Sequence, residues 1–364
     1  MSLFAGPGGT DEGARLVGVP DQIYGYDIDP DACATATAAG HNRTRANVVD
    51  LDPADFPAAT GAIVTPPCPP FSRAGLGRGH RDFPAIRESL ALLGDHFAGR
   101  AGERAYRGAL RDLADERSAL VVETLRFALG LPRARWLVAE QVPGAAGIWR
   151  EIGAELAACA DWEFIAVMSV ASEDLGVTAR RTRSFLVATR DYTPDLTGLP
   201  MRDLWVTGRF IAPADRPVIP ATLFRPPTMA QVLGWPTGER VNTRGNRKTP
   251  GGNVFSADGL SWCITEKTRS WRRVSDGRAL TEHEAGLLMG FPADYPWQGS
   301  RTRRFLQVAD AVSPVVAAAV LGAVLGLDWP KAVRTYLASI YPAPSAAPTY
   351  TQSALFDSWE GIAS

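Results

Sequence analysis

The sequence predicts an α/β protein built on an open sheet, with candidate binding residues at the ends of the strands. Short apolar runs that end in glycines, acids or a cysteine alternate with helical segments as far as about residue 190. Ligands bind to open α/β sheets outside the carboxyl ends of the strands, so these tips are the first place to look for a site. The chain has 364 residues, of which 46% are hydrophobic. That composition allows a large core, and the length suggests two domains.

Charge and cysteine content narrow the class of protein. The 38 Lys and Arg residues balance 39 Asp and Glu residues, for a net charge of −1, so any basic contact surface has to be local. None of the four cysteines forms a CxxC pair, and we expect no metal site. No secretory signal opens the chain, and no apolar run is long and uncharged enough to cross a bilayer. We therefore expect a cytoplasmic protein with reduced thiols and no membrane partner.

The first strand runs directly into a glycine-rich turn, LFAGPGG at residues 3–9. Gly6, Gly8 and Gly9 would let the backbone approach a ligand closely, as in dinucleotide-binding folds. We expect Thr10 to cap the helix that follows, because acidic residues occupy the next positions, where the helix dipole favours them.

Two further strand tips carry acids. The apolar run 22–28 ends at Asp27 and Asp29, and an acid about 20 residues after the glycines is expected to bind ribose hydroxyls. We interpret residues 47–50 as another strand tip, ending in Asp50. Together these tips describe a nucleoside pocket, and at this point NAD, ATP and S-adenosylmethionine all fit it.

A proline-rich loop at residues 65–72 holds a single cysteine, Cys68, after the apolar run 61–64. Proline fixes φ and removes N–H donors, so this loop can be neither a helix nor a ladder strand. It presents a thiol at the carboxyl end of a strand. Cys68 is a candidate nucleophile, and the alternative is a proline-rich turn that happens to contain a cysteine.

Possible partners for this thiol lie much later in the chain. Glu140 falls near the end of a predicted buried strand, 135–142. Arg181 and Arg183 share one face of an extended segment, because side chains alternate there, and two guanidinium groups can hold a carbonyl-rich or anionic ligand. The alternative for Glu140 is an ordinary ion-pair partner, and the alternative for the two arginines is a charged start of a strand.

Two arginine-rich segments suggest contact with nucleic acid. Residues 73–117 carry glycines and nine arginines, which predicts either a lid over the nucleophile or a helical insertion with one buried face. Residues 240–273 mix arginines with aromatic side chains, which favours a nucleic-acid contact surface over an irregular β-rich domain with ordinary charge. Beyond them we expect a helix within 278–292, capped near Thr281 and ended by Gly290, and an apolar helix at 310–327.

Taken together and in order, these features resemble the cytosine-C5 DNA methyltransferase family of phages and bacteria, over nearly the whole chain to about residue 325. The similar segments are residues 3–9, Asp27, Asp50, Pro67-Cys68, Glu140, Arg181 and Arg183, Leu280-Thr281 with Glu284, Gly290-Phe291-Pro292, Gln307 and Ala311-Val312.

The resemblance implies a Rossmann-like S-adenosylmethionine-dependent methyltransferase domain with a smaller, irregular β-rich target recognition domain. The implied divisions are a catalytic domain at 1–189, a recognition domain at 190–300, a returning helix at 301–330 and a peripheral tail at 331–364. It also implies S-adenosyl-L-methionine as cofactor, double-stranded DNA as partner, a monomer, and a bacterial or phage-infected cell. The implied cofactor-binding residues are Phe4, Ala5, Gly6, Gly8, Gly9, Asp27, Ile28, Asp50, Pro67, Leu125, Asp310, Ala311 and Val312.

The resemblance implies a chemistry as well. Cys68 adds to C6 of a cytosine that has been flipped out of the duplex, and a methyl group is transferred to C5. Glu140 stabilises the charge that develops on the N3 side of the ring. Arg181 holds the base carbonyl, and Arg183 supports it or the loop of Cys68.

Four positions depart from the family pattern: Gln141 and Asp310 each replace an Asn, and Thr178-Ala179 replace Pro-Gln. The carboxylate at position 310 lies where the family places the methyl end of the cofactor. It could weaken cofactor binding, select a modified cofactor or pair with a cation. An RNA cytosine-C5 methyltransferase, a variant that transfers a modified group and a catalytically silent DNA-binding relative therefore stay open. So do the target sequence and a restriction-modification, phage or orphan role.

Overall fold

The computed structural model describes residues 1–19, 22–68, 71, 78–159, 161–206, 208–212, 224–244 and 253–341. Its centre is a nine-stranded sheet in the order β3-β2-β1-β4-β5-β7-β6-β8-β9. The strands are β1 (Ser2–Leu3), β2 (Tyr24–Asp27), β3 (Asn42–Arg45), β4 (Gly61–Val64), β5 (Trp136–Gln141), β6 (Phe164–Ala171), β7 (Thr182–Thr189), β8 (Met201–Val206) and β9 (Arg209–Phe210). The predicted α/β class is confirmed.

The direction of the strands brings the candidate site together. β1 to β5 pair in parallel, so their carboxyl ends meet at one edge of the sheet. β7 pairs antiparallel with β5, and its register places Ser184 opposite Gln141. The start of β7 therefore lies at the same edge as the end of β5, which brings the predicted arginines close to Glu140.

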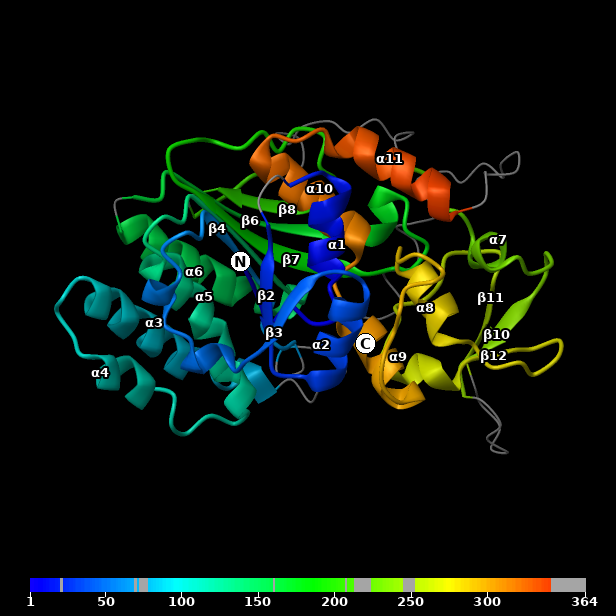
Figure 1. Ribbon diagram of the computed structural model, residues 1–364, viewed down its shortest axis with the longest axis horizontal. Coiled ribbons are helices and arrows are strands. Elements are labelled where there is room, and N and C mark those ends of the chain that lie inside the picture. Colours follow the sequence, from blue (N-terminus) through cyan, green and yellow to red (C-terminus); the bar gives the residue numbers. More distant parts are fainter. Residues whose placement is uncertain are drawn as a thin grey trace.

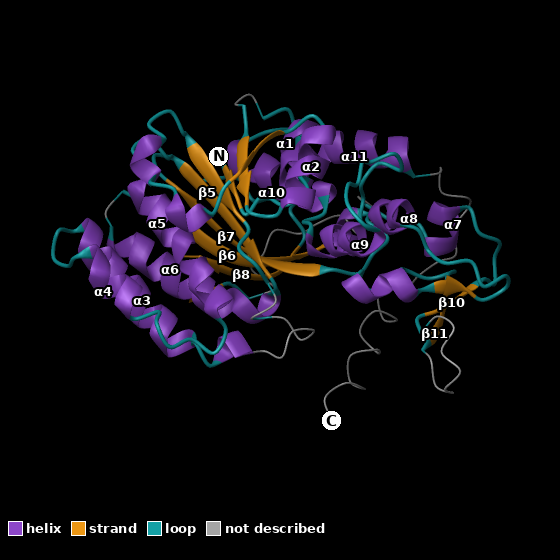
Figure 2. Ribbon diagram, turned by 60° about the horizontal axis from the view of Figure 1, so that its bottom comes forward, coloured by secondary structure: helices purple, strands orange, loops and turns teal. Residues whose placement is uncertain are grey.

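Helices cover both faces of the sheet (Figures 1 and 2). One face packs against α3 (Phe83–Phe97), α5 (Val122–Gly130) and α6 (Ala146–Ala158), whose apolar side chains form one core cluster with the strands. The other face packs against α1 (Gly9–Leu16), α10 (Pro314–Leu325) and α11 (Trp329–Ile340), which form a second cluster.

The expectation that no stretch could cross a bilayer is wrong by length and composition alone, because Arg301–Leu325 passes that test. However, 89% of its apolar window is buried inside the protein. It behaves as core structure. The predicted single helix at 310–327 is wrong at its start. Asp310 ends α9 (Arg301–Asp310), and α10 begins at Pro314. The extended Ala311 between them turns the chain, and a residue that precedes proline is also kept out of the helical region.

The remaining elements form a smaller region around a third core cluster, at the end of the molecule away from α3 and α4 (Glu103–Gly108) (Figure 2). They are α7 (Met229–Leu233), α8 (Glu282–Leu288) and a three-stranded sheet of β10 (Arg240–Asn242), β11 (Val254–Ser256) and β12 (Arg272–Arg273). α2 (Pro30–Ala38) lies between β2 and β3 in the chain.

Several local predictions can be compared with the structure. Thr281 caps α8 in a reciprocal capping box with Glu284, and Gly290 follows with φ +86°, as predicted. Thr10 does not cap α1, because the helix begins at Gly9 behind the left-handed Gly8. The predicted strand tip at 47–50 is also wrong, because β3 ends at Arg45 and a short 3-10 turn follows.

The arginine-rich insertion is helical over α3 and α4, with Leu90 and Leu93 buried, which favours the packed alternative for that part. The glycines at 75 and 77 lie outside the described residues.

The division into domains stays a prediction, but the fold adds two facts to it. The large sheet continues past residue 189, through β8 and β9 to Phe210. The first part of the expected tail forms α11, in which Val333 is fully buried and the Tyr336 hydroxyl donates to the Gly290 carbonyl over 2.8 Å.

Candidate active site

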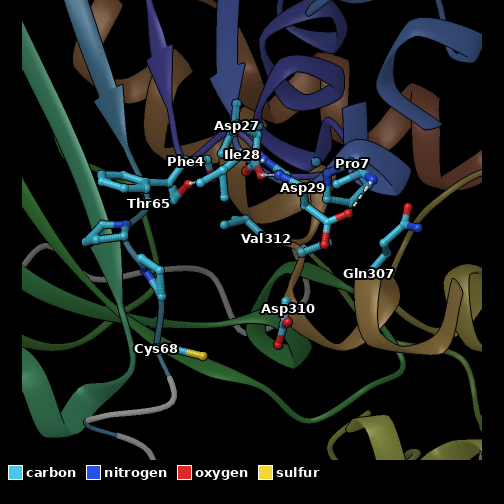
Figure 3. Close-up of a pocket in the computed structure, with 18 of the residues that line it drawn as sticks. Phe4, Pro7, Asp27, Ile28, Asp29, Thr65, Cys68, Gln307, Asp310 and Val312 are labelled. Carbon is cyan, nitrogen blue, oxygen red and sulfur yellow. Dashed lines mark hydrogen bonds between the residues drawn. The ribbon is translucent and has the colours of Figure 1, made fainter. Parts of the chain in front are cut away.

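A cleft of about 370 Å³ lies at the carboxyl edge of the sheet. Its walls come from the loop after β1, the ends of β2, β4 and β5, the start of β7, and the junction between α9 and α10. Figure 3 shows Asp27, Ile28 and Thr65 around one part of this cleft and Cys68 with Asp310 around another. The volume is within the usual range for a small-molecule site.

The glycine-rich turn is folded tightly against this cleft. Phe4 and Gly6 have φ of +55° and +54°, and Gly6 donates its N–H to Asp27 over 2.8 Å. Asp27 also accepts the N–H of Asp29 over 2.8 Å, so its carboxylate ties the turn after β1 to the end of β2. A Cβ at Gly9 would lie 2.1 Å from the Val312 carbonyl oxygen, so only glycine fits where α1 passes the α9–α10 junction.

Cys68 lies at the other end of the cleft, on the loop after β4. The side chain of the fully buried Gln141 donates to the carbonyls of Pro66 and Pro67, over 2.9 and 3.1 Å. Gln141 thus holds the backbone that carries the thiol. Burial raises the pKa of Cys68, and the nearby Arg183 guanidinium opposes that shift.

Glu140 and Arg183 form a buried ion pair beside Cys68, with 2.8 Å between Arg183 Nε and Glu140 Oε1. Burial raises the pKa of Glu140, while the two nearby arginines favour the ionised form. A carboxyl group in this balance can share a proton with a ring nitrogen, and a guanidinium can hold a carbonyl.

Arg181 is placed differently from Arg183. Its guanidinium donates to the backbone carbonyls of Ala309, Ala311 and Ile264, over 2.6, 3.3 and 3.3 Å. It does not line the cleft. Arg181 therefore fastens the start of β7 to the α9–α10 junction and to the smaller region, and Arg183 is the arginine that faces the thiol.

With this geometry established, the chain can be compared with known proteins. Residues 1–91 match the family model described as C-5 cytosine-specific DNA methylase. This match covers about the first quarter of the chain, which holds the glycine-rich turn and Cys68.

One curated relative is a Type II methyltransferase, M1.HphI of Haemophilus parahaemolyticus, 34% identical over 74 residues. That alignment covers 20% of this chain and 20% of the relative.

Solved structures confirm the methyltransferase fold over most of the chain. A DNA modification methyltransferase encoded within an E. coli prophage is 18% identical, with a TM-score of 0.58 over 90% of this chain and 98% of that one. Spodoptera frugiperda DNMT2 is 15% identical, with a TM-score of 0.58 over 89% and 98%. The Dnmt2 methyltransferase of S. pombe is 16% identical, with a TM-score of 0.58 over 89% and 97%. At these identities the likeness establishes the fold alone.

The family and the fold imply S-adenosyl-L-methionine as the cofactor, and the residues of the cleft fit it. Asp27 and Asp29 offer carboxylates for ribose hydroxyls, and Ile28 and Val48 offer apolar walls for a purine. The amino end of α1, at Gly9, suits the cofactor's amino-acid carboxylate.

Most of the predicted residues line this cleft, and four do not. Those that do are Phe4, Ala5, Gly6, Gly9, Asp27, Ile28, Pro67, Cys68, Glu140, Arg183, Asp310, Ala311 and Val312. The exceptions are Gly8, Asp50, Leu125 and Arg181.

The contacts of Arg181 are described above, and each of the remaining three exceptions also has a physical reason. Gly8 packs behind the turn, where a Cβ would lie 2.6 Å from the His41 ring. Asp50 is exposed at the end of the 3-10 turn, and Asn47 at its start lines the cleft instead. Leu125 is fully buried in the core under α5. Leu120, five residues earlier, lines the cleft.

Sequence reasoning named Gln307 and Asp310 but missed Arg303 and Leu306, which complete a wall of the site formed by α9. Arg303, Leu306, Gln307 and Asp310 line the cleft at spacings of three, four and seven residues, the pattern of one helix face. That periodicity was the available signal. Arg303 pairs with the carboxylates of Asp29 and Asp31, which fastens α9 to the start of α2.

The substituted pair Thr178-Ala179 connects the site to the smaller region. Ala179 donates its N–H to the Leu288 carbonyl over 3.0 Å, and the Thr178 hydroxyl donates to the Pro227 carbonyl over 3.0 Å. Both residues are fully buried. Their contacts support the backbone before β7, so the departure from the family pattern falls on a structural position.

Proposed function

We propose that the protein methylates carbon 5 of cytosine in double-stranded DNA, with S-adenosyl-L-methionine as the methyl donor. The observation that carries the proposal is the convergence of Cys68, Glu140 and Arg183 at one end of a cleft whose other end suits an adenosyl group. The match of residues 1–91 to the cytosine-specific family supports the same reaction.

The residues divide the chemistry between them. Cytosine C5 is a poor nucleophile, and addition of the Cys68 thiolate to C6 turns the ring into an enamine that can react at C5. Glu140 donates a hydrogen bond or proton at N3, where negative charge develops, and Arg183 holds the neighbouring carbonyl. The cofactor supplies an electrophilic methyl group on a sulfonium centre. Because C6 and C5 are inaccessible within a duplex, the base has to be flipped out first.

Because the pKa of Cys68 is raised, formation of its thiolate depends on the positive charge of Arg183. A buried thiol resists ionisation, so the thiolate forms only where positive charge compensates for lost hydration. Arg183 supplies that charge, but it already pairs with Glu140. Protonation of Glu140, or its engagement with N3, releases the full charge of Arg183 to the thiolate. Base binding and activation of the nucleophile are therefore coupled.

The smaller region suits a nucleic-acid substrate, and the DNA methylase family model that matches residues 1–91 favours DNA. Arg240 and Arg244 are exposed there and Arg269 is partly exposed, and accessible arginines suit a phosphate backbone. Trp262 is 38% exposed and stacks on Phe255 at 4.6 Å between ring centroids, which presents a rigid aromatic face. An RNA cytosine would meet the same catalytic groups, so RNA is the second candidate.

The proposal is tested by nucleoside mass spectrometry. Unmethylated plasmid DNA and total cellular RNA are incubated separately with the protein and S-adenosyl-L-methionine, then digested and analysed. We expect 5-methylcytosine in DNA, its loss in Cys68→Ser, and its retention in the matched control Cys159→Ser, which removes a thiol at the end of α6, outside the cleft. Methylation of RNA alone would replace DNA with RNA. No product in either, with cofactor binding demonstrated, would reject the proposed activity.

A further inference from the structure

Asp310 is an acid that the chemistry above leaves without a role. It ends α9 and lines the same cleft as Cys68 and Val312. In Figure 3 its carboxylate and the Cys68 thiol project into the same space from different walls of the cleft. The side chain is open to the cleft and so can reach a bound base.

Within the described part of the chain, the carboxylate of Asp310 has no hydrogen-bond or ion-pair partner. Both arginines near it are committed elsewhere. Arg183 pairs with Glu140, and Arg181 donates to backbone carbonyls. Two of those carbonyls belong to Ala309 and Ala311, on either side of Asp310, so Arg181 fixes the backbone that carries the acid.

This placement is unfavourable for a purely structural residue. A carboxylate at the carboxyl end of a helix faces the negative end of the helix dipole. Partial burial within the concave cleft also raises the pKa of Asp310, because the charged form loses hydration. An acid on a fixed backbone, without a partner among the described residues and partly desolvated in the cleft of a nucleophile, is typical of a group that exchanges protons.

We propose that Asp310 accepts the proton that leaves C5 of the base, an inference that rests on the proposed cytosine methylation. After transfer, C5 carries both the methyl group and its original hydrogen, and Cys68 is bonded to C6. Asp310 takes the C5 proton, and the C–H electron pair forms the C5=C6 bond. The C6–S bond breaks, and its electron pair returns to Sγ of Cys68. Asp310 then passes the proton to water, which restores the carboxylate.

The pH dependence of this step follows from the groups around Asp310. Arg181 and Arg183 face it from the start of β7, Glu266 from the smaller region, Asp29 from the cap of α2, and Cys68 and Glu140 from across the cleft. The acceptor has to be ionised, so proton removal falls as pH drops through the raised pKa of Asp310.

A test without the cofactor isolates this proton transfer. Addition of Cys68 to C6 makes C5 basic enough to take a proton from water, and C5 then carries that proton beside the tritium. Tritium is released when it, rather than the added proton, is removed as the C5=C6 bond forms again. DNA carrying [5-³H]cytosine is incubated with wild-type protein, Asp310→Asn and the matched control Asp112→Asn, which changes an exposed acid outside the cleft. We expect tritium release to fall at least tenfold in Asp310→Asn and to stay unchanged in the control.

A second assay uses unlabelled DNA with S-adenosyl-L-methionine. Asp310→Asn is expected to accumulate a denaturation-resistant protein–DNA adduct in which the base is already methylated. Wild-type protein is not expected to accumulate this adduct. Thermal melting and calorimetric binding of S-adenosylhomocysteine establish that the variant is folded. If it is not, Asp310→Glu keeps a carboxylate and is expected to release tritium with the same acidic pH limb as wild type.

The outcomes separate the two proposals. Wild-type exchange and methylation by a folded Asp310→Asn would overturn the role of Asp310 and leave the methylation intact. A raised KM for S-adenosyl-L-methionine with unchanged exchange would also overturn it, and would assign the carboxylate to cofactor binding. Absence of 5-methylcytosine and exchange in wild-type protein itself would overturn both.

Discussion

Replacing Gln141 with methionine should loosen the loop that holds the nucleophile. The Gln141 side chain is fully buried and makes three hydrogen bonds, to the carbonyls of Pro66 and Pro67 and from the N–H of Val142, the last over 2.7 Å. Methionine has a similar shape but provides none of the three.

The expected loss can be estimated from these contacts. A buried hydrogen bond contributes about 1 kcal/mol net, so three of them correspond to about 3 kcal/mol. A folded protein typically has about 5–15 kcal/mol of stability, so the variant should still fold. The main effect should therefore be local disorder around Cys68. Methyltransferase activity should fall by a larger factor than the helical content.

Urea unfolding followed by tryptophan fluorescence measures the loss of stability. Alkylation of Cys68 by iodoacetamide, followed by mass spectrometry, measures how far the loop around the thiol has loosened. We expect an unfolding free energy about 3 kcal/mol lower and faster alkylation. Gln298→Met is the matched control, because the Gln298 amide donates to a single carbonyl, that of Pro296, at an exposed position. A change below about 0.5 kcal/mol in Gln141→Met, with unaltered alkylation, would refute the view that these bonds hold the loop.

Three further changes test other parts of the site. Gly9→Ala places a Cβ 2.1 Å from the Val312 carbonyl oxygen, and calorimetry should find binding of S-adenosylhomocysteine weakened more than tenfold; unaltered binding would show that the turn yields easily. Arg303→Ala removes the ion pairs between α9 and the start of α2, and we expect the same Kd to rise about tenfold, or about 1.4 kcal/mol, with less effect on kcat. Burial raises the pKa of Cys68, so at pH 8 it should alkylate more slowly than free cysteine, with a rate that climbs as pH increases; a plateau below pH 8 would contradict that shift.

Much of the framework could be predicted from the sequence because its signals are local. Proline around Cys68 excludes regular structure whatever surrounds it, and the glycine-rich turn after a short apolar strand needs no distant contact to be recognised. Thr281 with Glu284 three residues later determines the start of α8, because the capping box closes within one helical turn. Apolar runs that alternate with helical segments likewise sufficed for the α/β class.

The identity of several site residues depended on tertiary structure, because it depends on contacts between distant segments. Alternation places Arg181 and Arg183 on one face, but only the fold shows that carbonyls more than 80 residues away occupy Arg181 and leave Arg183 at the cleft. Asn47 replaces Asp50 because the strand ends earlier than its apolar pattern indicates. Asp310 faces Cys68 only because α9 folds back across the carboxyl edge of the sheet. Sequence determines which chemical groups are available and their local backbone. Which groups stay unpaired and meet in one cleft is decided by long-range packing, since a hydrogen bond or ion pair made elsewhere removes a side chain from the site.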